Sequence, residues 1–334
     1  MLSRSEPTPS ISCVMPAFNE ARNLIWVIPE VLAALVALSP KIELIVVNDG
    51  SSDDTAQVMG RLCQRHPELV FLQLSRNFGK EAALTAGLDA AQGEVVVLMD
   101  ADGQHPSSFL SSMLQKWREG ADVVYAVRNT RDDQTRLQAR LTGLFYTLVN
   151  WGNRVKIPPH AGDFRLMDRL VVQALQSMPE RNRFMKGLYA WVGFTSTAIG
   201  YEPLPRAEGV SRFGLRGSLS LALTGIVAFS TAPLRALAWL GLVMSALAMV
   251  YGVVVVLEYF FFGMAVPGYA TIVVGMMLLS GIQLFAIGVL AEYVGRIYQE
   301  VKQRPAYLVR QRQGQGLIVT PTVDSPRPQS VDLP

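Results

Sequence analysis

Residues 93–106 read GEVVVLMDADGQHP, a short apolar run that ends in two carboxylates and a turn. The run from Glu94 to Met99 has the length and the β-branched content of a buried strand. Asp100 and Asp102 follow it directly, at the point where the strand is expected to end. Two carboxylates spaced in this way suit a hard divalent cation that also binds phosphate oxygens, such as Mg²⁺. The stretch therefore predicts a buried strand that leads into a metal-binding loop.

The surrounding sequence repeats this alternation of strand and helix. Short runs rich in Val, Ile and Leu alternate with helical patterns, which favours an open, doubly wound α/β sheet of mainly parallel strands with helices on both faces. The expected strands are Ile11–Met15, Ile42–Val47, Leu69–Leu74, Glu94–Met99 and Val123–Val127. The expected helices are Glu20–Leu38, Asp54–His66, Lys80–Ala91 and Ser107–Glu119. Ligands of such sheets bind beyond the carboxyl ends of the strands, so a site is expected in those loops.

Two other expected strands also end in polar residues. Residues 15–20 read MPAFNE and residues 47–55 read VNDGSSDDT. Carboxylates gathered at one edge of a sheet repel each other unless a cation or hydrogen-bond donors lie among them. The chain has no G-x-G-x-x-G after the first strand, no G-x-x-x-x-G-K-[ST] and no G-x-S-x-G. These absences argue against a dinucleotide site, a P-loop and the nucleophile elbow of α/β-hydrolases.

The apolar residues are unevenly distributed along the chain. Half of the 334 residues are hydrophobic and only 17% are charged, which is apolar for a soluble globular protein. The excess lies in residues 234–262 and 268–295, each longer than the roughly 20 residues that cross a bilayer. Between Ala236 and Ala291 the only charged residue is Glu258. These runs predict a transmembrane hairpin, with two helices buried in a large soluble core as the alternative.

Charge predicts how this hairpin is oriented. The loop between the two runs carries no Lys or Arg, whereas both flanks are basic. The basic flanking residues are Arg206, Arg212, Arg216, Arg235, Arg296, Lys302, Arg304, Arg310 and Arg312. By the positive-inside rule, both termini and the large N-terminal part are expected in the cytoplasm, with the protein integral to the cell inner membrane. The net charge of +3 argues against nucleic acid as a partner.

The expected organisation has six parts. Residues 1–10 form a flexible N-terminus, and residues 11–213 form the α/β domain. An amphipathic helix at the membrane interface is expected over residues 214–230, before the two spans. The remaining residues, 296–334, form a cytoplasmic tail that is Gly-, Gln-, Pro- and Ser-rich after Arg312 and expected to be partly disordered. Within the domain, a further helical stretch is expected from about Thr135 to Trp151.

The motifs taken together resemble a known enzyme family. They are PAFNE at 16–20, VNDGSSDDT at 47–55, RNFGKE at 76–81, GE at 93–94, DADGQHP at 100–106, GDFR at 162–165, RFMKG at 183–187, and Arg206 through Ser211-Arg212-Phe213. This set resembles the family 2 glycosyltransferases of GT-A fold. The match is to the polyprenyl-phosphate branch, which includes dolichyl-phosphate mannose synthase and the bactoprenol (undecaprenyl-phosphate) glucosyltransferases. The resemblance covers about residues 10–305, including the hairpin.

The resemblance implies donor-binding roles for residues at the first three strand ends. Pro16, Phe18 and Glu20 would line the nucleotide base and ribose, with Asp49 holding the base. Asn48 stands where many relatives have Asp, which favours Asp49 for that contact. Asp100 and Asp102, with Gln104, would hold the Mg²⁺ or Mn²⁺ that bridges the diphosphate, so that Asp100 also serves the nucleotide and Asp102 the catalysis.

The resemblance also implies where the acceptor binds. Asp163 matches an acidic residue that lies close to the acceptor in this family, and it is a catalytic candidate together with Asp102. The candidates for phosphate contacts on donor or acceptor are Arg128, Arg183, Lys186, Arg206 and Arg212. Two neighbours of these motifs have a structural interpretation beside a functional one. His105 could touch the metal but is expected to pack near the loop, and Lys80 could reach the diphosphate but is expected to be solvated.

The expected activity is an inverting, metal-dependent transfer of a hexose from a nucleotide-diphosphate sugar, UDP-glucose or a related UDP-sugar, to polyprenyl phosphate. Such a phosphate monoester is mostly dianionic at pH 7. Asp163 is therefore expected to orient the acceptor or balance Arg charge rather than to remove a proton. A processive polysaccharide synthase would carry a Q-x-x-R-W motif and more spans, and a catalytically silent membrane scaffold would have a degenerate metal loop. A homotetramer is implied by the resemblance alone.

Overall fold

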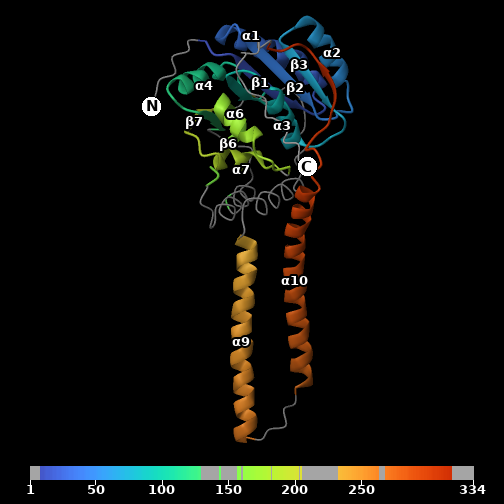
Figure 1. Ribbon diagram of the computed structural model, residues 1–334, viewed down its shortest axis with the longest axis vertical. Helices are drawn as coiled ribbons and strands as arrows, with labels where there is room; N and C mark the ends of the chain where they lie inside the picture. Colours follow the sequence, from blue (N-terminus) through green and yellow to red (C-terminus); the bar gives the residue numbers. More distant parts are fainter. Residues whose placement is uncertain are drawn as a thin grey trace, which may run out of the picture.

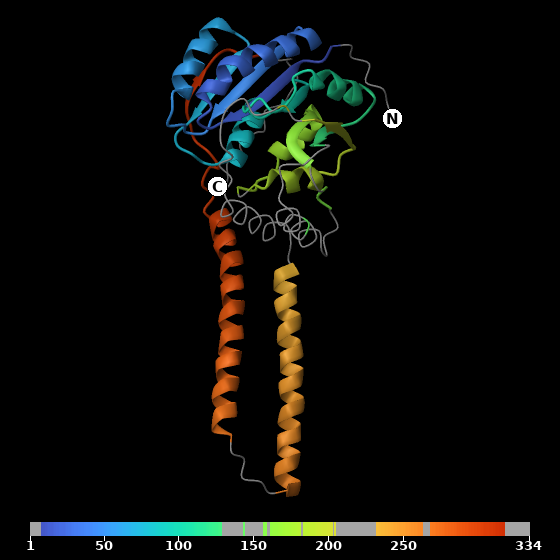
Figure 2. The same ribbon diagram turned by 180° about the vertical axis from the view of Figure 1, so that it is seen from behind.

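The computed structural model describes residues 8–128, 143, 156–158, 161–181, 183–202, 204, 232–262 and 268–317. It has an α/β domain and two long helices that extend from it side by side (Figures 1 and 2). The interfacial helix expected over 214–230 lies outside the described residues, and so does all but Gly143 of the helical stretch expected between Thr135 and Trp151.

The domain is built on one eight-stranded, mostly parallel sheet. Its strands are β1 (Ile11–Ala17), β2 (Ile42–Asn48), β3 (Leu69–Leu74), β4 (Val95–Leu98), β5 (Val123–Arg128), β6 (Ala161–Asp168), β7 (Ser196–Tyr201) and β8 (Val309–Gln313). They lie in the order β7-β5-β6-β4-β1-β2-β3-β8. β1 to β4 are parallel, whereas β6 runs antiparallel to β4 and β5, and β8 antiparallel to β3. The five expected strands are all present, and β6, β7 and β8 are additions that the sequence patterns did not predict.

Helices cover both faces of this sheet (Figure 1). One face packs against α1 (Ala21–Leu38), α2 (Thr55–Arg65) and α4 (Phe109–Arg118). The other face packs against α3 (Lys80–Ala90), α6 (Arg169–Gln176) and α7 (Met185–Trp191). The side chains of β1 alternate between the two layers, so that Met15 belongs to the first core and Val14 to the second. The expected doubly wound α/β fold is thereby confirmed.

Three helices of the described chain are long and apolar enough to cross a membrane, and they differ in burial. α1 is one of them, yet 44% of its window is buried because residues such as Leu24, Ile28 and Leu35 pack on the sheet. The other two candidates, Ala236–Val255 and Gly275–Val301, have none of their residues buried. An apolar helix that does not pack against a protein core is expected to be covered by lipid.

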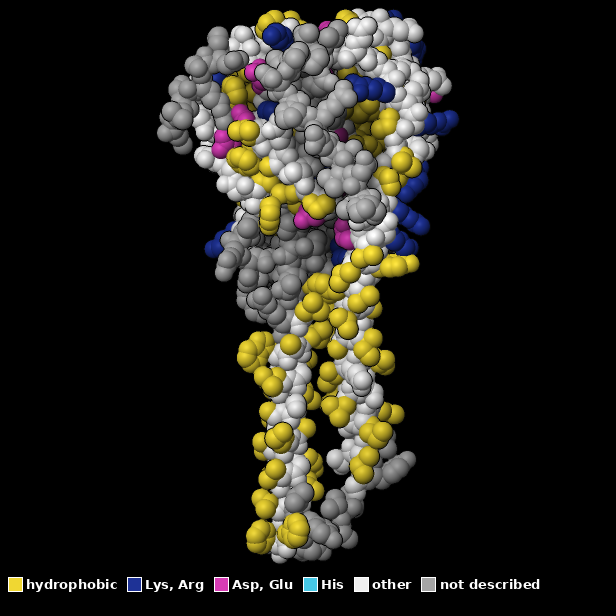
Figure 3. All heavy atoms as spheres, in the orientation of Figure 1, with side chains coloured by type: hydrophobic (Ala, Val, Ile, Leu, Met, Phe, Trp, Pro, Cys, Tyr) yellow, Lys and Arg dark blue, Asp and Glu magenta, His cyan; other side chains and the backbone are white. Residues whose placement is uncertain are grey.

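The two unburied candidates belong to α9 (Ala232–Phe262) and α10 (Tyr269–Val301), the helices expected as a hairpin. Yellow apolar side chains follow both helices along the face seen in Figure 3. Large apolar residues of these helices, such as Trp239, Phe260 and Phe285, are exposed, which a helix in water would not tolerate in such numbers. By length and composition α9 and α10 can both span a bilayer.

After α10 the chain returns to the α/β domain and adds a strand to it (Figure 2). β8 pairs antiparallel with β3, and Tyr307 donates a hydrogen bond of 2.7 Å to Asp89 of α3. Further on, the main-chain N–H of Leu317 donates to the buried carboxylate of Glu43. The predicted disorder of the tail after Arg312 is therefore wrong for residues 313–317. Composition misses such a strand because main-chain hydrogen bonds to an open sheet edge hold it, whatever the polarity of its side chains.

Candidate active site

The strand register brings two candidate carboxylates to the same edge of the sheet. β6 runs antiparallel to β4, with Leu98 paired to Arg165. Two residues beyond this pair, where β4 ends and β6 begins, Asp100 faces Asp163. This is also the edge at which β1 and β2 end, as the doubly wound topology requires. The two residues are brought together by an antiparallel strand that follows more than sixty positions later in the sequence.

Lys80 lies between these two carboxylates. Its Nζ atom is 2.7 Å from Oδ1 of Asp100 and 2.9 Å from Oδ2 of Asp163. Lys80 is the first residue of α3, and its side chain is 38% exposed. The expectation that this lysine is merely solvated is therefore wrong. It is instead the cation that keeps two carboxylates together at the end of the sheet.

The charges in this cluster set its protonation. Burial by itself would lower the pKa of Lys80, but the carboxylates of Asp100 and Asp163 outweigh burial and raise that pKa. Burial by itself would raise the pKa of Asp163, but Lys80 and Lys186 outweigh it and hold that pKa well below its usual range. The pKa of Asp100 is lowered in the same way, chiefly by Lys80. Lysine and carboxylates are therefore all charged at neutral pH.

The loop after β4 is ordered by its own hydrogen bonds. Oδ1 of Asp102 accepts from the main-chain N–H of Gln104 at 3.0 Å. Arg128, at the end of β5, donates from Nη2 to Oε1 of Gln104 at 3.1 Å. The side-chain oxygens of Asp100 and Gln104, both expected to hold a metal, thus each contact a cationic side chain. Arg128 is one of the predicted phosphate contacts, and the structure places it at this loop.

His105 holds the loop after β4 through a hydrogen bond and a ring contact. Its Nδ1 atom accepts from the main-chain N–H of Asp100 at 3.1 Å, and its ring stacks on Phe164 with centroids 4.5 Å apart. Burial lowers the pKa of His105, consistent with a neutral ring that accepts at Nδ1. The packing interpretation of His105 is confirmed.

The loops after β1 and β2 are joined through Asn19. This residue has a left-handed backbone, with φ of 57°, and its Oδ1 accepts from the main-chain N–H groups of Ser52 and Asp53. Its own N–H donates to Oγ of Ser51 at 2.8 Å. Asn tolerates the left-handed region better than most residues. Sequence patterns did not single out Asn19, although an Asn followed by Glu just before a helix is a turn signal.

The three candidates for the base and ribose lie on this joined surface. Pro16 is half-buried at the end of β1, and Phe18 is 39% exposed, which leaves its ring free to stack on a ligand. Glu20 accepts from Nδ2 of Asn23 at 2.6 Å, one turn into α1. β1 pairs with β4, so these residues lie next to the loop after β4, and their nucleotide contacts stay predictions.

Asp49 has a different set of partners from the one expected. It is 3% exposed, and its two oxygens accept from the main-chain N–H groups of Phe78 at 2.7 Å and Gly79 at 2.9 Å. Gly50, with φ of +67°, passes so close to Arg76 that a Cβ would lie 2.4 Å from its carbonyl carbon. Asp49 therefore fixes the loop that presents the first residue of α3, and a contact with the base stays a prediction.

Glu81 is a residue of the site whose shifted pKa no sequence pattern indicated. Its Oε2 accepts from the main-chain N–H of Met185 at 3.1 Å, which ties α3 to α7. Burial, followed by the charge of Asp163, raises the pKa of Glu81 to about 7, against the lowering effect of Lys80 and Lys186. Its place inside the RNFGKE motif was visible in the sequence, but its proximity to Asp163 was not.

Replacing Glu81 with Gln is expected to stabilise the protein at high pH and not at low pH. A carboxyl whose pKa rises on folding, here from 4.5 to about 7, contributes stability below pH 4.5 that is lost as the pH rises through 7. That loss is up to about 3 kcal/mol for such a shift. Gln keeps an oxygen for Met185 but cannot ionise. Thermal unfolding in detergent measures this effect. The stability difference between variant and wild type should be near zero at pH 4 and largest at pH 8. A difference independent of pH would contradict the prediction.

Three buried polar atoms near Asp163 have no hydrogen-bond partner within the described part of the chain. They are Oδ1 of Asp163, Nε of Arg165 and the hydroxyl of Tyr189. The guanidinium of Arg165 lies over the ring of Tyr189, 3.4 Å from its centroid, and Nη2 donates to the carbonyl of Gly162. Buried polar atoms without partners are unfavourable. They are expected where a ligand completes the hydrogen bonding.

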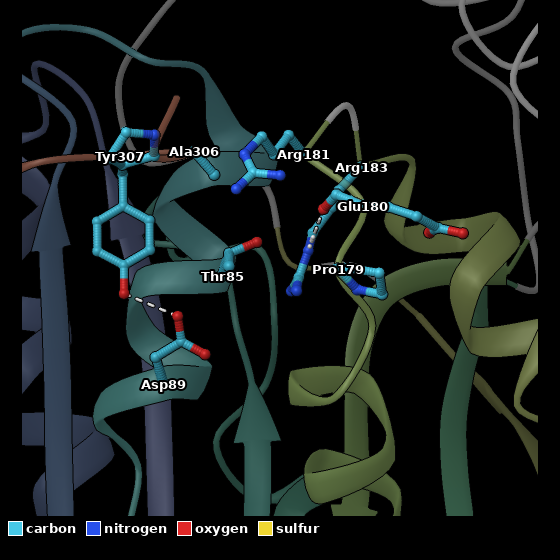
Figure 4. Close-up of a pocket in the computed structure, with 9 residues that line it drawn as sticks. Thr85, Asp89, Pro179, Glu180, Arg181, Arg183, Ala306 and Tyr307 are labelled. Carbon is cyan, nitrogen blue, oxygen red and sulfur yellow. Dashed lines mark hydrogen bonds between the residues drawn. The ribbon is translucent and has the colours of Figure 1, made fainter. Parts of the chain in front are cut away.

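The remaining phosphate candidates separate into three groups. Lys186, on α7, acts on the pKa of Asp163 and so belongs to the cluster. Arg183 instead donates to the main-chain carbonyls of Glu180 and Met178. It lines a cavity of about 360 Å³ between α3 and the segment after α10, together with residues that include Thr85, Asp89, Arg181 and Tyr307 (Figure 4). Arg206 and Arg212 lie outside the described residues.

The loop after β4 fits a divalent cation. Asp100, Asp102 and Gln104 offer oxygen atoms only, the ligands that Mg²⁺ and Mn²⁺ prefer. Lys80 already acts as a cation on Asp100. Within the described residues no three His, Cys, Asp or Glu side chains are grouped to hold a metal by themselves. The residues therefore fit an ion whose remaining ligands come from water or from a bound diphosphate.

Comparison with known proteins matches both parts of the chain. A family model described as "Glycosyl transferase family 2" matches residues 12–175, and one described as "GtrB C-terminal hairpin" matches residues 232–297. An uncharacterized glycosyltransferase of Synechocystis sp. is 43% identical over 302 residues, covering 90% of this chain and 95% of that protein. A prophage-derived bactoprenol glucosyl transferase of Shigella flexneri is 41% identical over 301 residues, covering 90% and 97%. Mannosyl-3-phosphoglycerate synthase from Rubrobacter xylanophilus is similar in structure at 20% identity, with a TM-score of 0.44 over 71% of this chain and 80% of that chain.

Proposed function

The chain belongs to glycosyltransferase family 2, and we propose from this that it transfers a hexose from a nucleotide-diphosphate sugar to polyprenyl phosphate. The observation that carries the proposal is the placement of one cluster. Asp100 and Asp163 meet through Lys80 where β4 ends and β6 begins, with Asp102 two residues after Asp100, in a chain that also has two helices able to span a bilayer. The relative from Shigella flexneri, named a bactoprenol glucosyl transferase, aligns with 90% of this chain and with 97% of its own length. Glucose, as UDP-glucose or a related UDP-sugar, is accordingly the first donor to test.

The donor would bind across the loops that follow β1, β2 and β4. Phe18 and Glu20 would face the base and ribose, and Asp100, Asp102 and Gln104 would hold Mg²⁺ or Mn²⁺. A divalent ion there would neutralise the diphosphate as it leaves. Arg128, which already reaches Gln104, would contact a phosphate oxygen of the donor.

The acceptor would approach from the side of Asp163. An oxygen of the lipid phosphate attacks the anomeric carbon, a new C–O bond forms, and the bond from that carbon to the diphosphate oxygen breaks with inversion. A phosphate that is already a dianion at pH 7 brings no proton to be removed. Asp163, held by Lys80 and near Lys186, would keep these cations in place beside the acceptor. Arg206 and Arg212 would meet the lipid phosphate at headgroup depth.

The membrane arrangement follows from charge and is part of the proposal. The flanks of the two apolar helices are basic and the loop between them is not. Both termini and the α/β domain would therefore lie on the cytoplasmic side of the inner membrane. Nucleotide sugars are water-soluble, so the donor would reach the site from that side, while the acceptor stays in the bilayer.

One assay tests the proposal directly. Purified protein is incubated with undecaprenyl phosphate and a panel of labelled nucleotide sugars, with and without EDTA. We expect a lipid-linked sugar from at least one donor, formed only without EDTA. Undecaprenol, which lacks the phosphate, is the matched control acceptor and should give no product. If no donor yields a lipid product under any metal condition, the proposed function is wrong.

A further inference from the structure

Lys80 contacts the carboxylate of Asp100, which is predicted to bind the metal. Its ammonium group is 2.7 Å from Oδ1 of Asp100, a predicted metal ligand, and 2.9 Å from Oδ2 of Asp163, a predicted acceptor residue. The two carboxylates come from the ends of β4 and β6. One positive charge therefore connects the donor side of the site to the acceptor side.

The position of Lys80 is not explained by the stability of its own helix. It is the first residue of α3, where the positive end of the helix dipole makes a cation unfavourable. The preceding Gly79 has φ of +101°, and the N–H groups of Phe78 and Gly79 are held by Asp49. The fold thus fixes this end of α3 firmly, and the ammonium group is directed at Asp100 and Asp163.

An ammonium group and a divalent ion cannot both sit on this face of Asp100. A divalent ion held by Oδ1 of Asp100 would displace the hydrogen-bonded ammonium group and repel it. Lys80 has a flexible four-carbon stem and can leave Asp100. The diphosphate that arrives with the metal carries the negative charge that Lys80 would then need.

We propose that Lys80 is an exchangeable counter-cation of the donor site: it neutralises Asp100 and Asp163 in the free enzyme and yields Asp100 to the metal when the donor binds. The inference rests on the proposed function for the identity of the donor. Arg128 stands in the same relation to Gln104, at 3.1 Å, so two metal-ligand oxygens are covered by protein cations. The enzyme without donor is thereby built to hold the metal weakly and the metal–donor complex tightly.

The test measures metal binding in the absence of any nucleotide. Mn²⁺ alone is titrated into full-length protein in detergent, and free Mn²⁺ is followed by electron paramagnetic resonance. Removal of a competing positive charge is expected to tighten Mn²⁺ binding by about tenfold or more in Lys80→Met. Lys80→Arg keeps the charge and should bind Mn²⁺ as wild type does. Lys116→Met, on α4 and paired with Glu119, is the matched control and should change nothing.

Each outcome of this titration decides the proposal. Equal or weaker Mn²⁺ binding by Lys80→Met overturns it, because a competitor would then not have been removed. Absence of Mn²⁺ binding by wild type, Lys80→Met and Lys80→Gln alike overturns it as well, together with the metal site. If Lys80→Met does not give a cooperative melt, Lys80→Gln takes its place with the same expected result. The readout contains no sugar transfer, so a failed transfer assay with tight Mn²⁺ binding in Lys80→Met would reject the proposed function and keep this inference.

Discussion

Replacing Asp102 with Asn is expected to lower the kcat/KM of sugar transfer by about 10³-fold. The predicted metal site has two carboxylates, and removal of one weakens the charge that stabilises the departing diphosphate, a loss of the size seen for single electrostatic groups in enzyme sites. Asn keeps an oxygen in the position from which Asp102 accepts the N–H of Gln104, so the loop should hold its shape. Initial rates at a series of Mg²⁺ concentrations measure the effect, and excess metal should recover part of it.

Asp54→Asn is the control for this substitution. Asp54 is an exposed residue at the start of α2, and its side chain makes no capping hydrogen bond. Asp54 lies in the acidic loop after β2, outside the cluster of Asp100 and Asp163. Its rate should equal that of wild type. An Asp102→Asn variant with a rate within a few fold of wild type, and unchanged metal dependence, would show that the loop after β4 does not hold the metal.

The central strands and their helices could be predicted from the sequence because each leaves a local signal. β1 to β4 are short, mostly apolar and buried runs, and the expected α1 to α4 begin and end within two residues of the observed helices. The loop at Asp100 and Asp102 was visible for the same reason, since it directly follows one of these runs. Local periodicity was sufficient wherever a buried element and its site residues are neighbours in the sequence.

The remainder of the site depends on contacts between distant segments, which no local pattern records. β6 contains Asp163 and Arg165 among apolar residues, and only its antiparallel pairing with β4 places Asp163 opposite Asp100. Lys80 reads as an ordinary helix-terminal lysine, because the two carboxylates that hold it lie far along the chain. Glu81 was missed as a titratable group for the same reason.

β8 shows a second limit of local patterns. Its sequence, VRQRQ, has four polar residues out of five and reads as part of a solvated tail. The strand forms because β3 would otherwise end the sheet with open main-chain groups. It also connects the end of α10 to the α/β domain, through Tyr307 and Asp89 among others. Pairing at a sheet edge therefore ties the end of α10 to the α/β domain, although the side chains gave no indication of it.

Replacing Asp163 with Asn is expected to lower kcat by no more than about 10²-fold, the cost of misplacing a reacting group by about an ångström. Lys80 and Lys186 hold the pKa of Asp163 well below its usual range, so the carboxylate is ionised and a poor proton acceptor at neutral pH. The rate should rise with pH as the lipid phosphate loses its second proton near pH ~6, in the variant as in wild type. Rates measured from pH 5 to 9 check this expectation.

Asp168→Asn is the matched control, since Asp168 lies at the other end of β6. Its oxygens accept from Trp117 and from the N–H of Leu170, and Asn can keep one of these bonds, so stability should fall somewhat while kcat stays the same.

The stability of Asp163→Asn should also depend on pH. Because the pKa of Asp163 is lowered on folding, its carboxylate stabilises the fold above the ordinary pKa of 3.8, and this effect is lost as the pH falls. The Tm of Asp163→Asn should accordingly be lower than that of wild type at pH 7, and the difference in Tm should be smaller at pH 3. A collapse of kcat beyond about 10⁴-fold with an altered pH profile would instead make Asp163 a proton-transfer residue. The modest loss follows if the acceptor brings its own nucleophilic charge and Asp163 serves to hold Lys80 and Lys186 around it.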